Sequence, residues 1–243
     1  MVSMLVGFLS IVVFGIVYYY DFSILHRIKD ADFASFSAGV GSVYVFIHMF
    51  PQLSHGQHLL EDTFPTVHFT GSQYTIYLVA LAGFLFFYMF DTFLTHTRRL
   101  PTDEYSTSGE LAFYWTNVIF ISLYNMLIGY VVGSYTTDNV SYRIIYMVAY
   151  VVHFLAIKHG IYHVFPKKYK RQGRYPIILG LFVGYFIGYF FPVSELVLSI
   201  SEALLTGAMV LSVFKHELPN EQDSKMKAFT IGIISSILLF MLL

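Results

Sequence analysis

Cysteine is absent from this chain, and charged residues are scarce. The 243 residues include no Cys, and only 12% are Asp, Glu, Lys or Arg. Without cysteine the chain has no disulfides, thiolate metal sites or iron–sulfur clusters. A soluble domain has about twice as many charges, whereas this chain is 56% hydrophobic. The net charge of −1 gives no sign of a nucleic-acid partner, and we expect none.

Long polar segments are also lacking, and apolar runs recur along the whole chain. Short alternating segments of the kind found in membrane β-barrels are absent. We therefore predict an all-α polytopic membrane protein, with residues 1–243 forming one domain in the lipid bilayer of a plasma (inner) membrane. The eight predicted transmembrane helices are residues 2–20, 33–50, 73–95, 111–133, 142–165, 175–191, 193–214 and 228–243.

Basic residues are almost missing from every second loop. Of the 14 Lys and Arg residues, 12 follow the first, third, fifth or seventh predicted helix. Cytoplasmic loops of membrane proteins are enriched in Lys and Arg, so we expect these loops to be cytoplasmic and both termini extracytoplasmic. The exceptions are Arg143, at a helix edge, and Lys158, inside the fifth helix.

The fifth predicted helix holds His153, Lys158, His159 and His163. Ionisable side chains inside the bilayer are costly and mark either a function or a buried partner. His159 and His163 lie towards the basic end of the helix, where interfacial side chains are common. We therefore expect His153 and Lys158 to face the interior.

Several segments of the chain resemble the ZIP family of divalent-metal transporters. They are SAGVGSVYVFIHMFP (37–51), LAGFLFFYMFDTF (81–93), LYNMLIGYVVG (123–133) and EALLTGAMVLSVFKHELPNE (202–221). The resemblance covers nearly the whole chain and implies a ZIP-like bundle of eight helices. It further implies that the second, fourth, fifth and seventh helices form the inner bundle, and that the function is metal-ion transport.

The chain departs from that family where the metals would bind. The family's fourth helix reads His-Asn-x-x-Asp-Gly and its fifth reads His-Glu-x-x-His-Glu, and together they form a two-metal site. The matching positions here are Tyr124, Asn125, Ile128 and Gly129, followed by His153, Phe154, Ile157 and Lys158. Only Asn125 and His153 remain as ligand types. A charged Lys158 would repel a dication strongly in a low dielectric.

Two functional hypotheses follow. In the leading one, the protein moves a different solute, or is a non-transporting membrane subunit or regulator. In the alternative, it carries Zn, Mn or Fe with a reduced set of ligands drawn from Asn125, His153, Glu202, Tyr124 and His48. That divalent ion is the one cofactor considered. A homodimer or another membrane subunit stays open as a partner.

We do not expect an enzyme. The sequence HGIYH at 159–163 lacks the Glu of the HExxH zinc-protease motif.

Three further expectations concern packing and charge. Residues 51–72, with His55, His58 and His68, are expected to form a solvated polar loop rather than a metal site. The glycines of the fourth and sixth helices are expected to pack within the chain rather than in a dimer. Lys158 is expected to pair with Glu202, with Asp91 as the second choice, because a tethered ion pair avoids an isolated charge in hydrocarbon.

Overall fold

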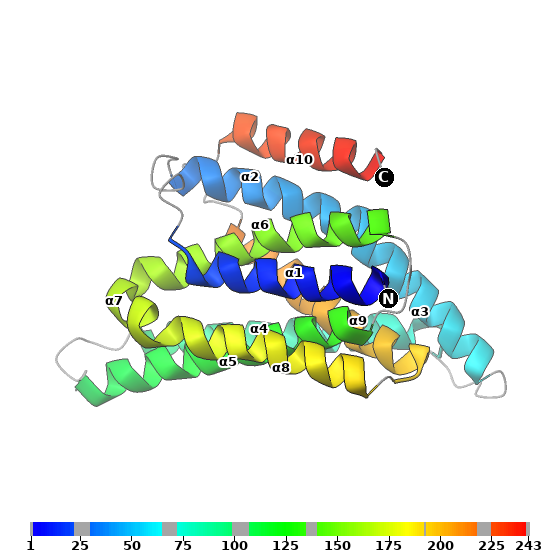
Figure 1. Cartoon of the computed structure of the whole chain (residues 1–243), viewed down its shortest axis with the longest axis horizontal. Helices are drawn as coiled ribbons and strands as arrows, with labels where there is room; N and C mark the ends of the chain where they lie inside the picture. The colour runs from blue at the N-terminus through cyan, green and yellow to red at the C-terminus, as the bar shows by residue number, and fades with distance from the viewer. Residues whose placement is uncertain are drawn as a thin grey trace.

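The computed structural model describes residues 2–21, 30–64, 72–98, 107–134, 140–191, 193–217 and 225–241. All regular elements in these ranges are helical, which confirms the predicted all-α class. Figure 1 shows most of the helices lying side by side along one common direction. In chain order the elements are α1 (Val2–Tyr19), α2 (Asp30–Val43), η2 (Tyr44–Met49), α3 (Phe50–Thr63), η3 (Ser72–Tyr74), α4 (Thr75–Arg98), α5 (Thr107–Ser134), α6 (Val140–Val164), α7 (Pro166–Lys168), η4 (Tyr169–Gly173), α8 (Arg174–Phe190), α9 (Glu195–Leu211), η5 (Ser212–Glu217) and α10 (Met226–Met241).

Many of these helices suit a bilayer. Within the described residues, five helical segments are long and apolar enough to cross a membrane: Ala31–Thr63, Ser72–Phe93, Leu111–Ser134, Pro166–Phe190 and Glu195–Lys215. Two shorter apolar helices are Leu5–Tyr19 and Met226–Met241. Large apolar side chains are exposed along α4, where Phe86 and Met89 are 62% and 69% exposed. Such surfaces are stable against lipid, and helices satisfy their own backbone hydrogen bonds there.

The second predicted helix is longer than expected. The segments α2, η2 and α3 form one continuous rod, so the predicted loop at 51–72 is wrong as far as Thr63. Pro51 normally ends a helix because it lacks a backbone N–H. Here it lies in the first turn of α3, directly after the π-helical turn η2, where the Phe50 N–H donates to the Val45 carbonyl. This wider turn lets the helix continue past the proline.

Three helix pairs are joined through glycines: α5 with α8, α4 with α9, and α2 with α10. A side chain on Gly184 would collide with the Met126 carbonyl, and one on Gly129 with the Leu181 carbonyl. The corresponding glycines are Gly83 and Gly207 between α4 and α9, and Gly39 and Gly232 between α2 and α10. Close backbone approach at small residues is a main source of helix association in membranes. The glycines of α5 and α8 thus pack within the chain, as predicted.

The first helix lies deeper in the bundle than the resemblance implies. It packs against α6 and α8, and Ile11, Phe14 and Tyr18 are almost fully buried. The main core also draws on η2, α5, α6 and α9, and on α8, whose Ile177 and Leu181 are fully buried. Helices α1 and α8 therefore contribute to the core beside the four helices that the resemblance places inside.

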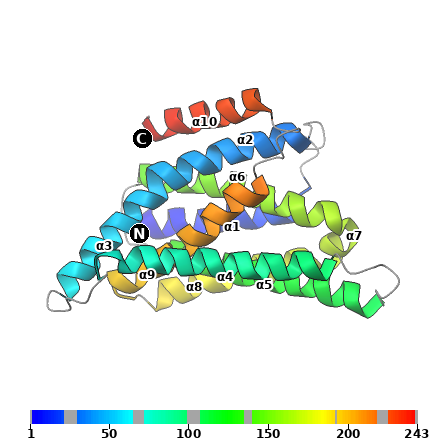
Figure 2. The same ribbon diagram turned by 180° about the vertical axis from the view of Figure 1, so that it is seen from behind.

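The two ends of the bundle differ in charge. Helix α1 begins and α10 ends at one end, which we name the far end, and α7 lies at the opposite end (Figures 1 and 2). The α7 end carries the basic run KKYKR of α7 and η4, residues 167–171. We name it the basic end.

Candidate functional site

The positions that match the ZIP metal site face each other across α5 and α6. The Tyr124 hydroxyl shares a 3.0 Å hydrogen bond with the Nε2 atom of His153. It also lies 3.8 Å from the sulfur of Met209 on α9. The Asn125 amide nitrogen donates to the Ile121 carbonyl of its own helix at 2.8 Å. His153 is thus hydrogen-bonded to Tyr124, and Asn125 donates through its nitrogen, whereas the buried Oδ1 of Asn125 has no hydrogen-bond partner among the described residues.

Apolar side chains fill the rest of this position. Ile128 and Phe154 are almost fully buried, and Ile157 is half-buried. Helix α1 supplies two aromatic rings, because the Phe14 and Tyr18 centroids lie 5.0 and 5.3 Å from that of Phe154. Packed apolar side chains offer no ligands for a dication. Across the described residues, no three His, Cys, Asp or Glu side chains form a group able to hold a metal ion.

Lys158 binds the end of α1. Its amino group donates to the Val17 carbonyl at 3.0 Å and also to the Tyr20 carbonyl. The last four carbonyls of a helix accept no hydrogen bond from a backbone N–H of that helix, and they carry partial negative charge. A lysine there satisfies both the hydrogen bonds and the charge, although it comes from another helix.

Three more side chains complete this arrangement. The Tyr169 hydroxyl donates to the Tyr18 carbonyl at 2.8 Å, and Arg174 donates to the Tyr19 carbonyl at 3.2 Å. Lys170 pairs with Asp21, just beyond the helix, with 2.5 Å between Nζ and Oδ2. We name Lys158, Tyr169, Lys170 and Arg174 the α1 collar. Together they provide a partner for each residue from Tyr18 to Asp21.

The hydrogen bonds of Lys158 go to α1 carbonyls rather than to the expected Glu202, and the carboxylate that acts on Lys158 is Asp21. Glu202 lines a cavity whose α1 residues, Gly7, Ser10 and Phe14, precede the Val17 carbonyl bound by Lys158. The second choice, Asp91, pairs instead with Lys215 at 2.5 Å.

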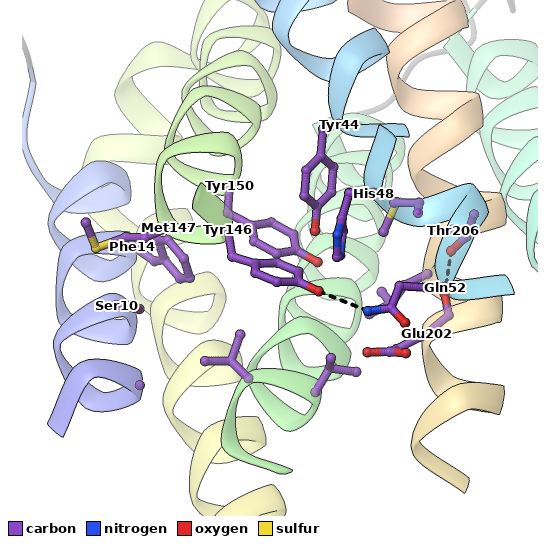
Figure 3. A pocket seen from close by; sticks show the side chains of 15 residues that line it. Ser10, Phe14, Tyr44, His48, Gln52, Tyr146, Met147, Tyr150, Glu202 and Thr206 are labelled. Carbon is purple, nitrogen blue, oxygen red and sulfur yellow. Dashed lines mark hydrogen bonds between the residues drawn. The ribbon is translucent and has the colours of Figure 1, made fainter. Parts of the chain in front are cut away.

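The cavity around Glu202 is the second polar feature of the interior. It has a volume of about 40 Å³ and is lined by residues of α1, η2, α3, α5, α6 and α9. Figure 3 shows its polar lining, in which the hydroxyls of the tyrosines point towards His48, Gln52 and Glu202. We name it the aromatic cavity and define it by Tyr44, His48, Gln52, Tyr146, Tyr150 and Glu202. It lies in the half of the bundle nearer the far end, because α6 begins at that end.

The side chains of the aromatic cavity contact one another closely. The His48 ring stacks on Tyr44 with 5.1 Å between centroids and meets Tyr146 edge-on at 4.2 Å. The Gln52 amide nitrogen donates to the Tyr146 hydroxyl at 3.5 Å. The Tyr150 hydroxyl lies beside that of Tyr44 and within electrostatic reach of Glu202. Glu202 and His48, two candidates from the sequence, therefore line the same cavity.

The histidines of α3 lie elsewhere. His55 is 3.6 Å from Glu195, and His58 is 3.9 Å from Glu61, all with exposed side chains. His68 lies outside the described residues. Exposed pairs of this kind contribute little to stability or to metal binding. The sequence interpretation as a solvated segment thus agrees with their exposure, although the segment is helical.

Sequence reasoning missed most of the cavity lining. Gln52, Tyr44, Tyr146 and Tyr150 were not considered, although they carry a readable signal. Tyr44, His48 and Gln52 follow one another at intervals of four residues, as do Tyr146 and Tyr150. That spacing places each set on one helix face.

Comparison with known proteins gives no family assignment: no family model and no curated protein matches the chain.

Proposed function

We propose that this protein is a ZIP-like membrane carrier that has lost the two-metal centre and binds a different solute in the aromatic cavity. One observation carries the proposal. The positions that match the metal site are occupied by hydrogen-bonded and apolar side chains, whereas Glu202 lines an interior cavity. A carboxylate at membrane depth that faces a cavity is typical of a solute or ion pathway.

The proposal includes eight spans in a plasma (inner) membrane, with the basic end in the cytoplasm. The basic run of α7 and η4 supports this orientation. Tags at both termini should then be accessible from outside, and a tag at the exposed Gln172 only from the cytoplasm. Termini accessible on the same side as Gln172 would contradict the orientation.

The proposed loss of the metal centre rests on chemistry. A Zn²⁺ site needs about four ligands, with anionic ones favoured in a low dielectric. The α5–α6 position retains one imidazole, bonded to Tyr124, and one carboxamide, whose nitrogen bonds to Ile121 and whose Oδ1 has no partner among the described residues. These two neutral groups fall short of such a ligand set. In the ZIP family, metal ions supply the positive charge at this position. Here Lys158 supplies a positive charge instead, and its amino group stabilises the end of α1.

A zinc-dependent thermal shift of the purified full chain tests this proposal. A ligand that binds only the folded state must raise the unfolding temperature. We expect that zinc gives no shift that depends on His153. A shift that disappears in His153→Gln and Asn125→Ala, but persists in His48→Gln, would contradict the proposal. The three variants are matched because each removes one buried polar side chain.

A reduced divalent-metal carrier is the second candidate. It is favoured by a single observation, namely that His48 and Glu202 line the same cavity. Imidazole and carboxylate are both common ligands of Zn²⁺. In this case the zinc shift should disappear in both His48→Gln and Glu202→Gln.

A further inference from the structure

We propose that the aromatic cavity binds a small ammonium-type cation, either ammonium itself or a protonated methylamine. This inference rests on the proposed function, because it names the solute class of the same cavity. It depends on the charge, the ring surfaces, the hydrogen-bonding groups and the size of the cavity.

The charge of the lining favours a cation. Glu202 is the acidic residue among the lining side chains, and the lining contains no Lys or Arg within the described residues. The basic residues of the α1 collar bind α1 from Val17 to Asp21, beyond the α1 residues Gly7, Ser10 and Phe14 that line the cavity. The cavity therefore offers a negative site separated from the cations of the basic end.

The ring surfaces favour an ammonium group over a metal ion. Phe14, Tyr44, Tyr146 and Tyr150 all line the cavity. The face of an aromatic ring attracts ammonium-type cations, and aromatic cages are a recurrent way of binding them. A Zn²⁺ ion instead takes thiolate, imidazole or carboxylate ligands, of which the cavity has His48 and Glu202.

The polar groups suit N–H donors. Figure 3 shows the Tyr146 hydroxyl and the Glu202 carboxylate directed towards the side of the cavity where the Gln52 amide lies. Tyrosine hydroxyls, the amide oxygen and the carboxylate can all accept hydrogen bonds. An ammonium ion has several N–H donors, so one carboxylate and two or three neutral acceptors match it well.

The size of the cavity sets an upper limit on the ligand. Its volume is about 40 Å³. One water-sized group needs roughly 10–15 Å³ by this measure, so the cavity holds about three such groups. Ammonium and methylammonium fit within this limit. Tetramethylammonium, with five heavy atoms, exceeds it.

The test is thermal unfolding of the purified full chain in detergent, with methylammonium chloride compared with sodium chloride at equal ionic strength. We expect a saturable rise in unfolding temperature with methylammonium and none with tetramethylammonium chloride. The apparent affinity should weaken by about tenfold or more in Glu202→Gln, because a charged hydrogen-bond partner is lost. Glu195→Gln is the matched control, since its exposed side chain lies outside the cavity. It should leave the affinity unchanged.

A second variant keeps the test decisive if Glu202→Gln does not fold. Tyr146→Leu removes one ring face while leaving the carboxylate in place, and it should also weaken methylammonium binding. Absence of a methylammonium-specific shift, or equal shifts in Glu202→Gln and the unsubstituted chain, would overturn the inference. A zinc shift that requires His48 and Glu202, without any methylammonium shift, would overturn it in favour of the divalent-metal candidate. A zinc shift that requires His153 would overturn the proposed function itself.

Discussion

The buried Lys158 and the half-buried Glu202 have opposite surroundings. Lys158 lies near the basic end, where its amino group donates to two carbonyls at the end of α1. Glu202 lies nearer the far end, at the wall of the aromatic cavity. The hydrogen bonds of Lys158 are directed at the protein backbone, whereas Glu202 faces space large enough for a small solute.

The difference between Lys158 and Glu202 affects how an ionisable residue in a membrane helix should be interpreted. Such a residue marks a function or a buried partner, and the sequence alone does not distinguish them. A lysine can be accommodated by the end of a neighbouring helix, where backbone carbonyls accept its hydrogen bonds and Asp21 supplies a nearby carboxylate. In this protein the more buried charge, Lys158, donates to backbone carbonyls, and the half-buried Glu202 lies next to open space in the cavity.

The largest effect on stability is expected at α5, the helix that borders both the α5–α6 position and the aromatic cavity. Gly184 of α8 packs on the Met126 carbonyl of α5, and α5 contributes to both the metal-site position and the cavity wall. Gly184→Ala should destabilise the protein by about 3 kcal/mol, because overpacking forces the helices apart. Gly15→Ala is the matched control, since its added carbon would make ordinary contacts with side chains, the Phe182 ring at 3.4 Å and Ile178 at 3.7 Å. Equal unfolding free energies for the two variants in a denaturant titration would contradict this.

Removing Lys158 should disrupt the α1 collar but leave the aromatic cavity intact. Lys158→Met should lower the free energy of unfolding by about 2 kcal/mol, as expected for lost hydrogen bonds from a charged donor. Lys167→Met, at an exposed site on α7, should change it by less than about 0.5 kcal/mol. Both are measured by unfolding in detergent. If Lys158→Met were as stable as the control, Lys158 would not hold α1.

A smaller effect is expected from one neutral hydrogen bond of the same collar. Tyr169→Phe removes the bond to the Tyr18 carbonyl and should cost about 1 kcal/mol. Tyr77→Phe on the exposed side of α4 serves as control and should be neutral. A cost above that of Lys158→Met would show that the tyrosine, and not the lysine, anchors the helix end.

The smallest effect on stability is expected at the cavity. Glu202→Gln should change the free energy of unfolding without ligand by no more than about 0.5 kcal/mol, because a polar cavity accommodates the amide equally well. A loss of about 2 kcal/mol or more in the same unfolding assay would give Glu202 the structural role assigned to Lys158.

The sequence predicted the helices better than it predicted their partners. All eight apolar runs overlap helical segments of the structure, because apolar length is sufficient to identify such helices. The continuation through Pro51 was missed, since proline is normally a helix breaker and the π-helical turn before it has no simple sequence pattern. Glycine spacing, in contrast, did predict close packing within the chain, although not that α5 and α8 are the partners.

The partner of Lys158 was missed for a physical reason. Only acidic side chains were considered, yet backbone carbonyls at a helix end are acceptors too. Every helix has such an end, so the sequence of α6 does not reveal which one Lys158 meets. The loss of carboxylates at Ile128, Phe154 and Lys158 was visible in the sequence, but the burial of Phe154 under Phe14 and Tyr18 of α1 was not.

Side chains of the protein itself occupy the α5–α6 position. Anomalous scattering from crystals soaked in zinc or cadmium is the most direct test of this. We expect no anomalous peak between α5 and α6 near Asn125 and His153. A pair of strong peaks at that position would contradict it and restore an ordinary two-metal site.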